Sequence, residues 1–233
     1  MTAVAPRATP PRPAPPLAVL RYVFADLLRS QRWVAPLLFG AVAIVLFNSH
    51  PDPLLAIYGN TAVALLPIGI WMTYVAVTAE DAVQAGMTAV IVGGPGRLRV
   101  AKLAAALLLG LGYAVVATAT PLIVQDHTDA ATPGTVVAGL VAAATIAVFA
   151  VAVGAVVSPP LVRRRGWSVM IAAAVLVLDT AVPHAPPARA LLEVFDPDHP
   201  HHLAVGITVT AIATVAISLV AVAVSTRMAS RRG

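Results

Sequence analysis

The sequence predicts an all-α protein that crosses a membrane several times. Of its 233 residues, 59% are hydrophobic and only 11% are charged, and the mean hydropathy is +0.89. Soluble domains are roughly 45–50% apolar and about 25% charged, so this chain requires lipid as its solvent. Within the bilayer, each backbone N–H and C=O must be hydrogen-bonded inside its own span, and a helix needs about 20 apolar residues to cross. Six such segments fit in the sequence.

The N-terminal residues 1–16 are predicted to be a disordered tail. They include six prolines, which remove backbone donors and clash with the preceding helical turn. The tail also lacks the apolar core and cleavage site of a signal peptide. Residues 17–32 follow with apolar side chains at a spacing of three to four and with Arg21, Arg29 and Arg32 beside them. This pattern predicts an amphipathic helix in the membrane interface, with its arginines reaching lipid headgroups.

Residues 33–226 are predicted to form one transmembrane domain of six helices. The predicted spans are 33–47, 57–79, 100–124, 134–157, 167–183 and 203–226. Trp33 opens the first span, because aromatic rings favour the boundary between membrane and water. The longest connection is 184–202, and residues 227–233 are expected to be a basic tail. No connection is long enough to form a separate soluble domain.

Basic residues predict the orientation of these spans. Fourteen of the 15 lie in the N-terminal segment, the second and fourth connections and the C-terminal tail, and only Arg189 lies elsewhere. Because cytoplasmic loops are rich in Lys and Arg, both termini are expected in the cytoplasm. The same asymmetry accounts for an isoelectric point near 10.4 without a nucleic-acid partner. The Ala-, Val-, Pro- and Arg-rich composition favours a high-GC bacterium, and hence its cytoplasmic (inner) membrane.

The connection around residues 80–99 carries the most functional information. Glu80 and Asp81 close the second predicted span, a short semi-apolar helix is expected next, and a Gly-Gly-Pro-Gly break follows it. Arg97 and Arg99 then lead into the third span. A helix lying across the ends of two long spans can dock onto another protein and pass a rigid-body movement into both. The alternative is an ordinary cytoplasmic hairpin with acidic caps and topological basic residues.

This loop, together with the interfacial helix and the six spans, resembles the permease subunits of ABC type 2 exporters. In that family a connecting helix in the interface precedes six spans, and the first cytoplasmic loop forms a coupling helix that contacts the ATPase. Gly86 and Pro95 match the spacing of the family's loop motif, and Arg97 or Arg99 stands at its basic position. The family's run of Glu and Arg before the glycine is reduced here to Glu80, Asp81 and Gln84. Lys102, which opens the third span, lies closer to Pro95 than the lysine does in most of the family. The resemblance implies that these residues couple the chain to the ATPase: Glu80, Asp81, Gln84, Gly86, Pro95, Arg97 and Arg99.

The resemblance also implies a division of roles between subunits. Two ABC ATPase subunits would bind ATP and Mg²⁺, whereas this chain would bind no cofactor. With a second copy or a related permease, it would enclose the translocation path. The short external connections suit a hydrophobic or amphipathic cargo such as a lipid, a peptide or a drug-like metabolite. The sequence has no cysteine, no phosphate-binding loop and no serine-hydrolase or zinc-protease motif, so it is not expected to be an enzyme.

Other charged or kinked positions have more than one interpretation. Arg163, Arg164 and Arg165 form a cytoplasmic anchor, either as a topology signal alone or as a contact for anionic headgroups or the ATPase. Asp179 lies near the outer end of the fifth span, where it can serve the substrate path, snorkel to the interface or cap a helix. Pro67 removes a helical hydrogen bond within the second span, which can create a hinge or only shape the packing.

Four histidines in the longest connection belong to a residue type that binds zinc or copper. They are His184, His199, His201 and His202. The prolines between them prevent a helical ligand pair, and no spaced partner motif accompanies them. No metal site is therefore expected.

Two other functions remain open for a chain of this composition. An ion-coupled secondary transporter usually shows an internal repeat and several ionisable residues at the midplane, whereas only Asp179 and His50 are near candidates here. A non-transporting membrane scaffold or sensor subunit needs neither feature. Association with an ATPase would separate the ABC function from both alternatives.

Overall fold

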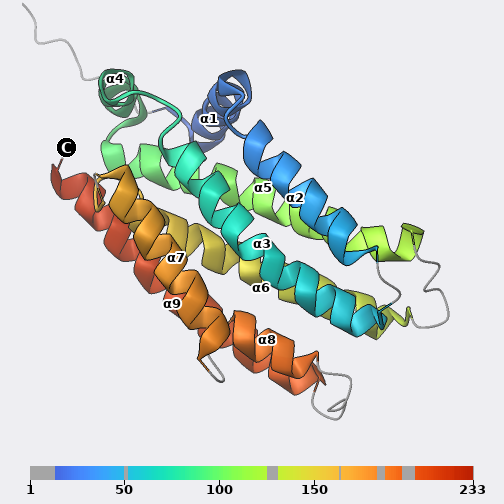
Figure 1. The fold of residues 1–233 in the computed structure, drawn as a ribbon. Coiled ribbons are helices and arrows are strands. Elements are labelled where there is room, and N and C mark those ends of the chain that lie inside the picture. The colour runs from blue at the N-terminus through green and yellow to red at the C-terminus, as the bar shows by residue number, and fades with distance from the viewer. Residues whose placement is uncertain are drawn as a thin grey trace, which may run out of the picture.

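The structure of the chain, a computed structural model, describes residues 14–49, 52–124, 131–162, 164–182, 187–195 and 203–232. Within those ranges the regular structure is entirely helical (Figure 1). The helices are α1 (Pro16–Ser30), α2 (Val34–Phe47), α3 (Leu54–Val77), α4 (Ala82–Val92), α5 (Pro95–Val124), α6 (Pro133–Val157), α7 (Arg165–Ala181), α8 (Ala188–Val194) and α9 (Leu203–Arg232). Four of them, α3, α5, α6 and α9, are long and apolar enough to cross a membrane. The prediction of an all-α, multi-span membrane protein is confirmed.

The helices α1 and α2 meet at a sharp bend. Taken together they would also be long and apolar enough to cross a membrane, but their axes are bent by 80°. At the bend, Gln31 has a φ of 54°, a left-handed conformation that ends α1. The helix α1 therefore lies across one end of the bundle, while α2 runs along it (Figure 1).

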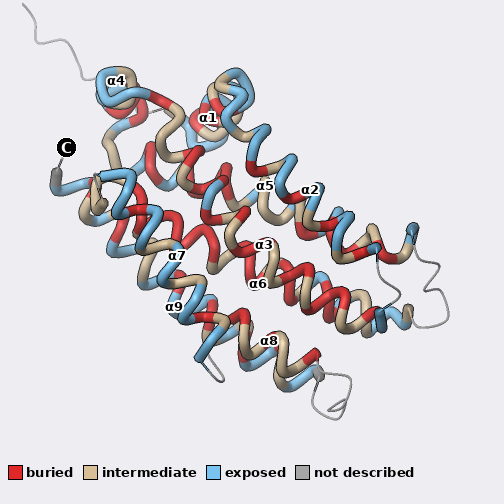
Figure 2. The backbone as a smooth tube through the Cα atoms, in the orientation of Figure 1, coloured by how far each residue is buried: buried red, intermediate tan, exposed pale blue. Residues whose placement is uncertain are grey.

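The centre of the bundle is the packed pair α3 and α6. Figure 2 shows buried positions concentrated along these two helices, whereas α2, α7 and α9 each expose a long side. Small residues let the two axes approach closely. A Cβ added at Gly154 would lie 2.5 Å from Thr73 Cβ, and one added at Gly69 would lie 2.6 Å from Ala150 Cβ. Close approach of this kind supplies the van der Waals contact that stabilises helix pairs in lipid.

Two segments differ from their expected structure. The predicted connection 184–202 contains the short helix α8, whose Ala188 and Leu191 are fully buried against the bundle. The helix α9 continues to Arg232 through residues expected to form a basic tail, because no proline interrupts it. The four histidines of the connection lie outside the described residues.

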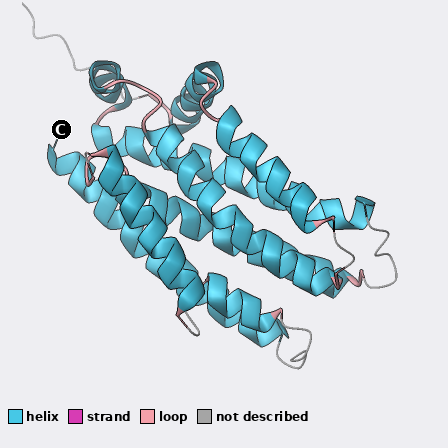
Figure 3. Cartoon of the chain, viewed as in Figure 1, coloured by secondary structure: helices cyan, strands magenta, loops and turns pink. Residues whose placement is uncertain are grey.

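Basic side chains gather at one end of the bundle. Figure 1 places α1, α4 and the C-terminal end of α9 there, with α8 toward the opposite end. Figure 3 shows the short loops that join α4 to α3 and α5. This arginine-rich end is defined by Arg21, Arg29, Arg32, Arg97, Arg99, Lys102, Arg164, Arg165, Arg227 and Arg231. Residues from both halves of the sequence thus meet at one surface.

Candidate functional site

The helix α4 lies across the arginine-rich end, outside the bundle of long helices (Figure 1). Its first turn is capped by Asp81, whose carboxylate accepts hydrogen bonds from the backbone N–H groups of Val83 and Gln84, both at 2.8 Å. Such a cap satisfies donors that have no partner within the helix. The acidic residue expected to close the second span therefore begins α4.

A two-glycine corner ends α4. Gly93 and Gly94 have φ angles of 91° and 130°, which are unfavourable for residues with a side chain. Pro95 then begins α5, where its missing N–H costs no helical hydrogen bond. The segment 80–99 is thus α4, this corner and the first turn of α5.

A buried ion pair fastens the start of α4 to α5. Lys102 Nζ lies 2.6 Å from Glu80 Oε2, and the two side chains are only 7% and 1% exposed. The other carboxylate oxygen accepts hydrogen bonds from the hydroxyls of Tyr22 on α1 at 2.9 Å and Thr88 on α4 at 3.0 Å. A buried charge is tolerated only when it is paired and hydrogen-bonded. These four residues, the Glu80 cluster, therefore hold α1, α4 and α5 in one arrangement.

A second set of contacts, centred on Arg99, joins α5 to the ends of α6 and α9. Its Nε donates to Ser225 Oγ at 2.7 Å, and its Nη2 donates to the carbonyl of Ala155 at 2.6 Å and to Ser158 Oγ at 3.1 Å. Its Nη1 donates to the carbonyl of Pro159. A planar guanidinium can serve several acceptors at once, which an ammonium group cannot do in the same geometry. We refer to these five residues as the Arg99 cluster.

Arg97 and Arg99 lie on opposite sides of α5. Two positions along a helix are separated by about 200° around its axis. Arg99 is buried, whereas Arg97 is exposed and lines a groove between α1, α5 and α9. Arg99 accordingly holds helices together, and Arg97 remains accessible to a ligand.

The outward side of α4 is apolar. Val83, Met87, Val90 and Ile91 are 73%, 61%, 78% and 68% exposed, and their spacing places them on one side of the helix. Gly86 lies among them, and a Cβ added there would have no neighbour within 4 Å. Single exposed apolar residues are ordinary, but a contiguous set marks an interaction surface. We call these five residues the α4 face.

A groove of about 650 Å³ separates α4 from the connection that follows α6. Asp81 and Gly86 line it on the α4 side, Arg99 lines it from α5, and Pro159 and Pro160 line it from the connection. Glu80 and Lys102 also line it, so members of both clusters border the same depression. It is a second surface at which α4 can receive part of another protein.

The helix α1 rests on the bundle through one side. Its buried residues are Val19, Val23 and Leu27. Beyond its end, Arg32 donates from Nη1 to the carbonyl of Thr78 at 3.0 Å, which links it to the end of α3. Arg21 and Arg29 are exposed, as a contact with lipid headgroups requires.

The other predicted basic and kinked positions lie apart from α4. Arg164 and Arg165 are exposed at the start of α7, and Arg163 lies outside the described residues. Pro67 lies inside α3 and lines a groove of about 430 Å³ between α3 and α7, which Arg165 also borders. This groove is otherwise largely apolar, as the side of a membrane-embedded helix pair is expected to be.

Asp179 contacts the start of α8. Its two carboxylate oxygens each lie 3.3 Å from the backbone nitrogen of Ala188, which donates to them. This contact satisfies a donor that has no partner within α8. Of the roles that the sequence left open for Asp179, capping is the one that this contact supports.

Sequence reasoning missed the uncharged members of both clusters. Tyr22 and Glu80 are 58 residues apart in the chain, and Arg99 and Ser225 are 126 apart. The sequence does show hydroxyl side chains on largely apolar helices, and such a hydroxyl needs a hydrogen-bond partner. The identity of that partner depends on how the helices pack, so no local pattern could have supplied it.

Comparisons with models of protein families, with characterised proteins and with solved structures found no match to this chain. No group of three His, Cys, Asp or Glu side chains in the described ranges could hold a metal ion. The buried charged residues of those ranges are Glu80, Arg99, Lys102 and Asp179, and each has an ion-pair or hydrogen-bond partner. The best-defined arrangement at the arginine-rich end is thus a junction between helices that carries an apolar outer face.

Proposed function

We propose that this chain is the membrane-spanning permease subunit of an ATP-driven ABC exporter. The observation that carries the proposal is the α4 face, which exposes four large apolar side chains on a short helix held firmly by the Glu80 cluster. A permease needs such a coupling helix because its ATPase is a separate chain. The α4 face would dock onto an ABC ATPase subunit, and ATP and Mg²⁺ would bind to that partner.

The predicted coupling residues divide into two roles. Glu80 and Arg99 are buried, so their role is to position α4 and the first turn of α5. Asp81 begins α4, and Gln84 donates a hydrogen bond to α1 at 3.4 Å. Gly86 lies on the α4 face, where the absence of a side chain lets a partner approach the backbone.

Movement of α4 would reach most of the bundle. The Glu80 cluster joins α4 to α1 and α5, and the Arg99 cluster joins α5 to α6 and α9. Buried polar networks resist separation, because each broken contact leaves an unpaired polar group. A push from an ATPase would therefore move these helix ends together, and a path between two permease copies would open to alternate sides.

The proposal includes six spans with both termini in the cytoplasm of a bacterial inner membrane. The helices α2 and α7 contain 14 and 17 residues, which correspond to about 21 Å and about 26 Å against a hydrocarbon core of about 30 Å. Local thinning of the bilayer accommodates spans of this length. The arginine-rich end would be the cytoplasmic end under the positive-inside rule.

The cargo is proposed to be hydrophobic or amphipathic, and a second copy or a related permease would complete the path. Pro67 supports this assignment because it lines the mostly apolar groove between α3 and α7. Asp179 would reach the path only by exchanging its hydrogen bond with the N–H of Ala188. The apolar groove is therefore the better-supported part of the path.

An ion-coupled secondary transporter is the alternative from a different class. It needs ionisable side chains near the middle of the membrane. In the part of the chain that the structure describes, Glu80, Lys102 and Arg99 are buried at the arginine-rich end, and Asp179 is buried beside α8. A non-transporting scaffold is the other alternative, and it would use the α4 face to hold a partner that is not an ATPase.

The test is co-purification of an ATP-binding subunit with the tagged full-length chain from its native membrane, identified by mass spectrometry. The paired change Met87→Ser/Ile91→Ser removes two apolar side chains from the α4 face. Apolar anchors at an interface contribute about 1 kcal/mol or more each, so recovery of the ATPase should fall about tenfold or more.

The matched control is Leu28→Ser/Met170→Ser, which removes two side chains that are 50% and 63% exposed on α1 and near the start of α7. This pair should leave recovery of the ATPase unchanged. Equal loss in both variants, or a folded wild-type chain that recovers no ATP-binding subunit, would overturn the proposal. The second outcome would favour the secondary transporter or the scaffold.

A further inference from the structure

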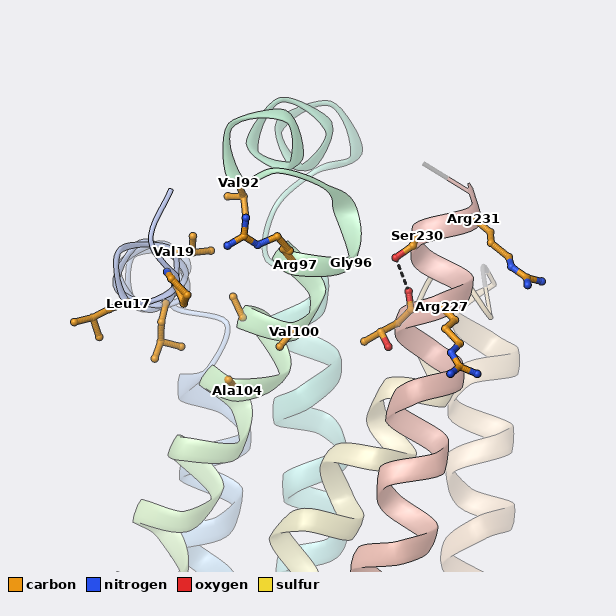
Figure 4. A pocket seen from close by; sticks show the side chains of 14 residues that line it. Leu17, Val19, Val92, Gly96, Arg97, Val100, Ala104, Arg227, Ser230 and Arg231 are labelled. Carbon is orange, nitrogen blue, oxygen red and sulfur yellow. Dashed lines mark hydrogen bonds between the residues drawn. The ribbon is translucent and has the colours of Figure 1, made fainter. Parts of the chain in front are cut away.

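A groove at the arginine-rich end has the lining of a lipid site. It lies between the start of α1, the start of α5 and the end of α9, and its volume is about 830 Å³ (Figure 4). Leu17 and Leu20 of α1 and Val100 and Ala104 of α5 line its apolar part. We propose that this groove binds one anionic glycerophospholipid, whether or not the chain is a transporter.

The apolar surface continues along α5 to about the depth of one leaflet. A second groove of about 230 Å³, between α5, α6 and α9, shares Val100 and Ala104 with the first and extends to Leu107. From Gly96 to Leu107 the helix rises about 17 Å, and half of a hydrocarbon core is about 15 Å. An acyl chain can therefore lie along α5 while its headgroup stays at the arginine-rich end.

Three arginines border the upper part of the groove, and none of the described residues that line it carries a carboxylate. Arg97 comes from α5, and Arg227 and Arg231 come from the end of α9. In Figure 4, Arg97 extends toward α1, whereas the two arginines of α9 extend away from α5. All three are exposed, and none of their side chains bonds to another described residue. Long arginine side chains can turn toward an anion while their stems cover apolar surface.

The combination of charge and apolar lining selects the ligand. A soluble phosphate would contact the arginines but leave the apolar walls exposed to water. A zwitterionic lipid would place an ammonium group beside three guanidinium groups, which is unfavourable between like charges. An anionic glycerophospholipid satisfies both parts, because its phosphate meets the arginines and its acyl chain covers the walls.

The experiment is native mass spectrometry of the purified full-length chain, titrated with phosphatidylglycerol or with phosphatidylcholine of the same acyl chains. One phosphatidylglycerol should be retained, and phosphatidylcholine should not. The change Arg97→Gln/Arg227→Gln should weaken retention of phosphatidylglycerol by about 30-fold. Each arginine near an anionic group contributes about fivefold, and the two factors multiply. Ala104→Phe fills the apolar groove without changing charge and should weaken retention as well.

Two controls separate a built site from general attraction. Arg29→Gln/Arg164→Gln removes two exposed charges from the same end outside the groove, and Ala41→Phe adds the same ring at an exposed position of α2. Both should bind phosphatidylglycerol as the wild type does, and millimolar glycerol 3-phosphate should not displace it. Equal retention of the two lipids, equal weakening by the control pair, or displacement by glycerol 3-phosphate would each overturn the proposal.

Discussion

The ion pair between Glu80 and Lys102 offers the sharpest test of the junction at the arginine-rich end. Lys102→Met keeps most of the side-chain volume but leaves a carboxylate whose side chain is only 1% exposed. Removing one partner of a buried pair costs about 3–5 kcal/mol. The hydroxyls of Tyr22 and Thr88 still donate to Glu80, so we expect a loss near the lower limit, about 3 kcal/mol.

The reciprocal change completes a double-mutant cycle. Glu80→Gln keeps an oxygen acceptor for the two hydroxyls but leaves the ammonium of Lys102 buried without a counter-charge, so a similar loss of about 3 kcal/mol is expected. The double variant Glu80→Gln/Lys102→Met removes both charges. It should lower the free energy of unfolding by no more than either single change does. The cycle should therefore show a coupling energy of about 3 kcal/mol.

Unfolding in mixed micelles of SDS and a non-ionic detergent, followed by circular dichroism, measures these free energies. Arg29→Met is the control, because Arg29 is exposed and its substitution should change stability by less than about 0.5 kcal/mol. If the two single effects were additive, with a coupling energy below about 0.5 kcal/mol, the conclusion that this ion pair is buried away from water would be refuted.

Three further predictions concern other contacts. Arg99→Lys should lower the free energy of unfolding in the same titration by about 1–3 kcal/mol, because one ammonium cannot satisfy all the buried acceptors; an unchanged midpoint would contradict this. Gly94→Ala should cost about 1–3 kcal/mol through its φ of 130°, whereas Gly86→Ala should stabilise α4 by about 0.5–1 kcal/mol, so equal effects of the two would count against the corner. Asp179→Ala should remove about 1 kcal/mol of capping and speed amide exchange in α8 by mass spectrometry, with α3 as the internal control; unchanged exchange would exclude the cap.

Part of the site around α4 could be predicted from the local sequence. The short helix expected within residues 80–99 is α4, because Asp81 is a good N-cap and Gly93 and Gly94 permit the left-handed corner. The exposed stripe of α4 also follows from helical periodicity once the helix is known to lie outside the bundle. The helix α8 was missed, since seven residues between proline-rich segments carry too little periodic pattern.

The local sequence pattern could not predict which of Arg97 and Arg99 is buried. Both are arginines in the same turn, and both fit the basic position of the loop motif. Only the packing of α6 and α9 against one side of α5 decides that Arg99 is buried among carbonyl and hydroxyl groups, while Arg97 faces the groove. The packing of α1 against α5 likewise brings Tyr22 to Glu80.

The sequence by itself determined the solvent of this protein, its helical secondary structure and the segregation of its basic residues, because hydropathy and periodicity are local properties. The tertiary structure decided which charges are paired in the interior, which remain at the surface and where apolar grooves open between helices. These features depend on contacts between residues as far apart in the chain as Arg99 and Ser225. Such contacts exist only after α5, α6 and α9 have packed, so they follow from the relative placement of the helices and not from any single segment.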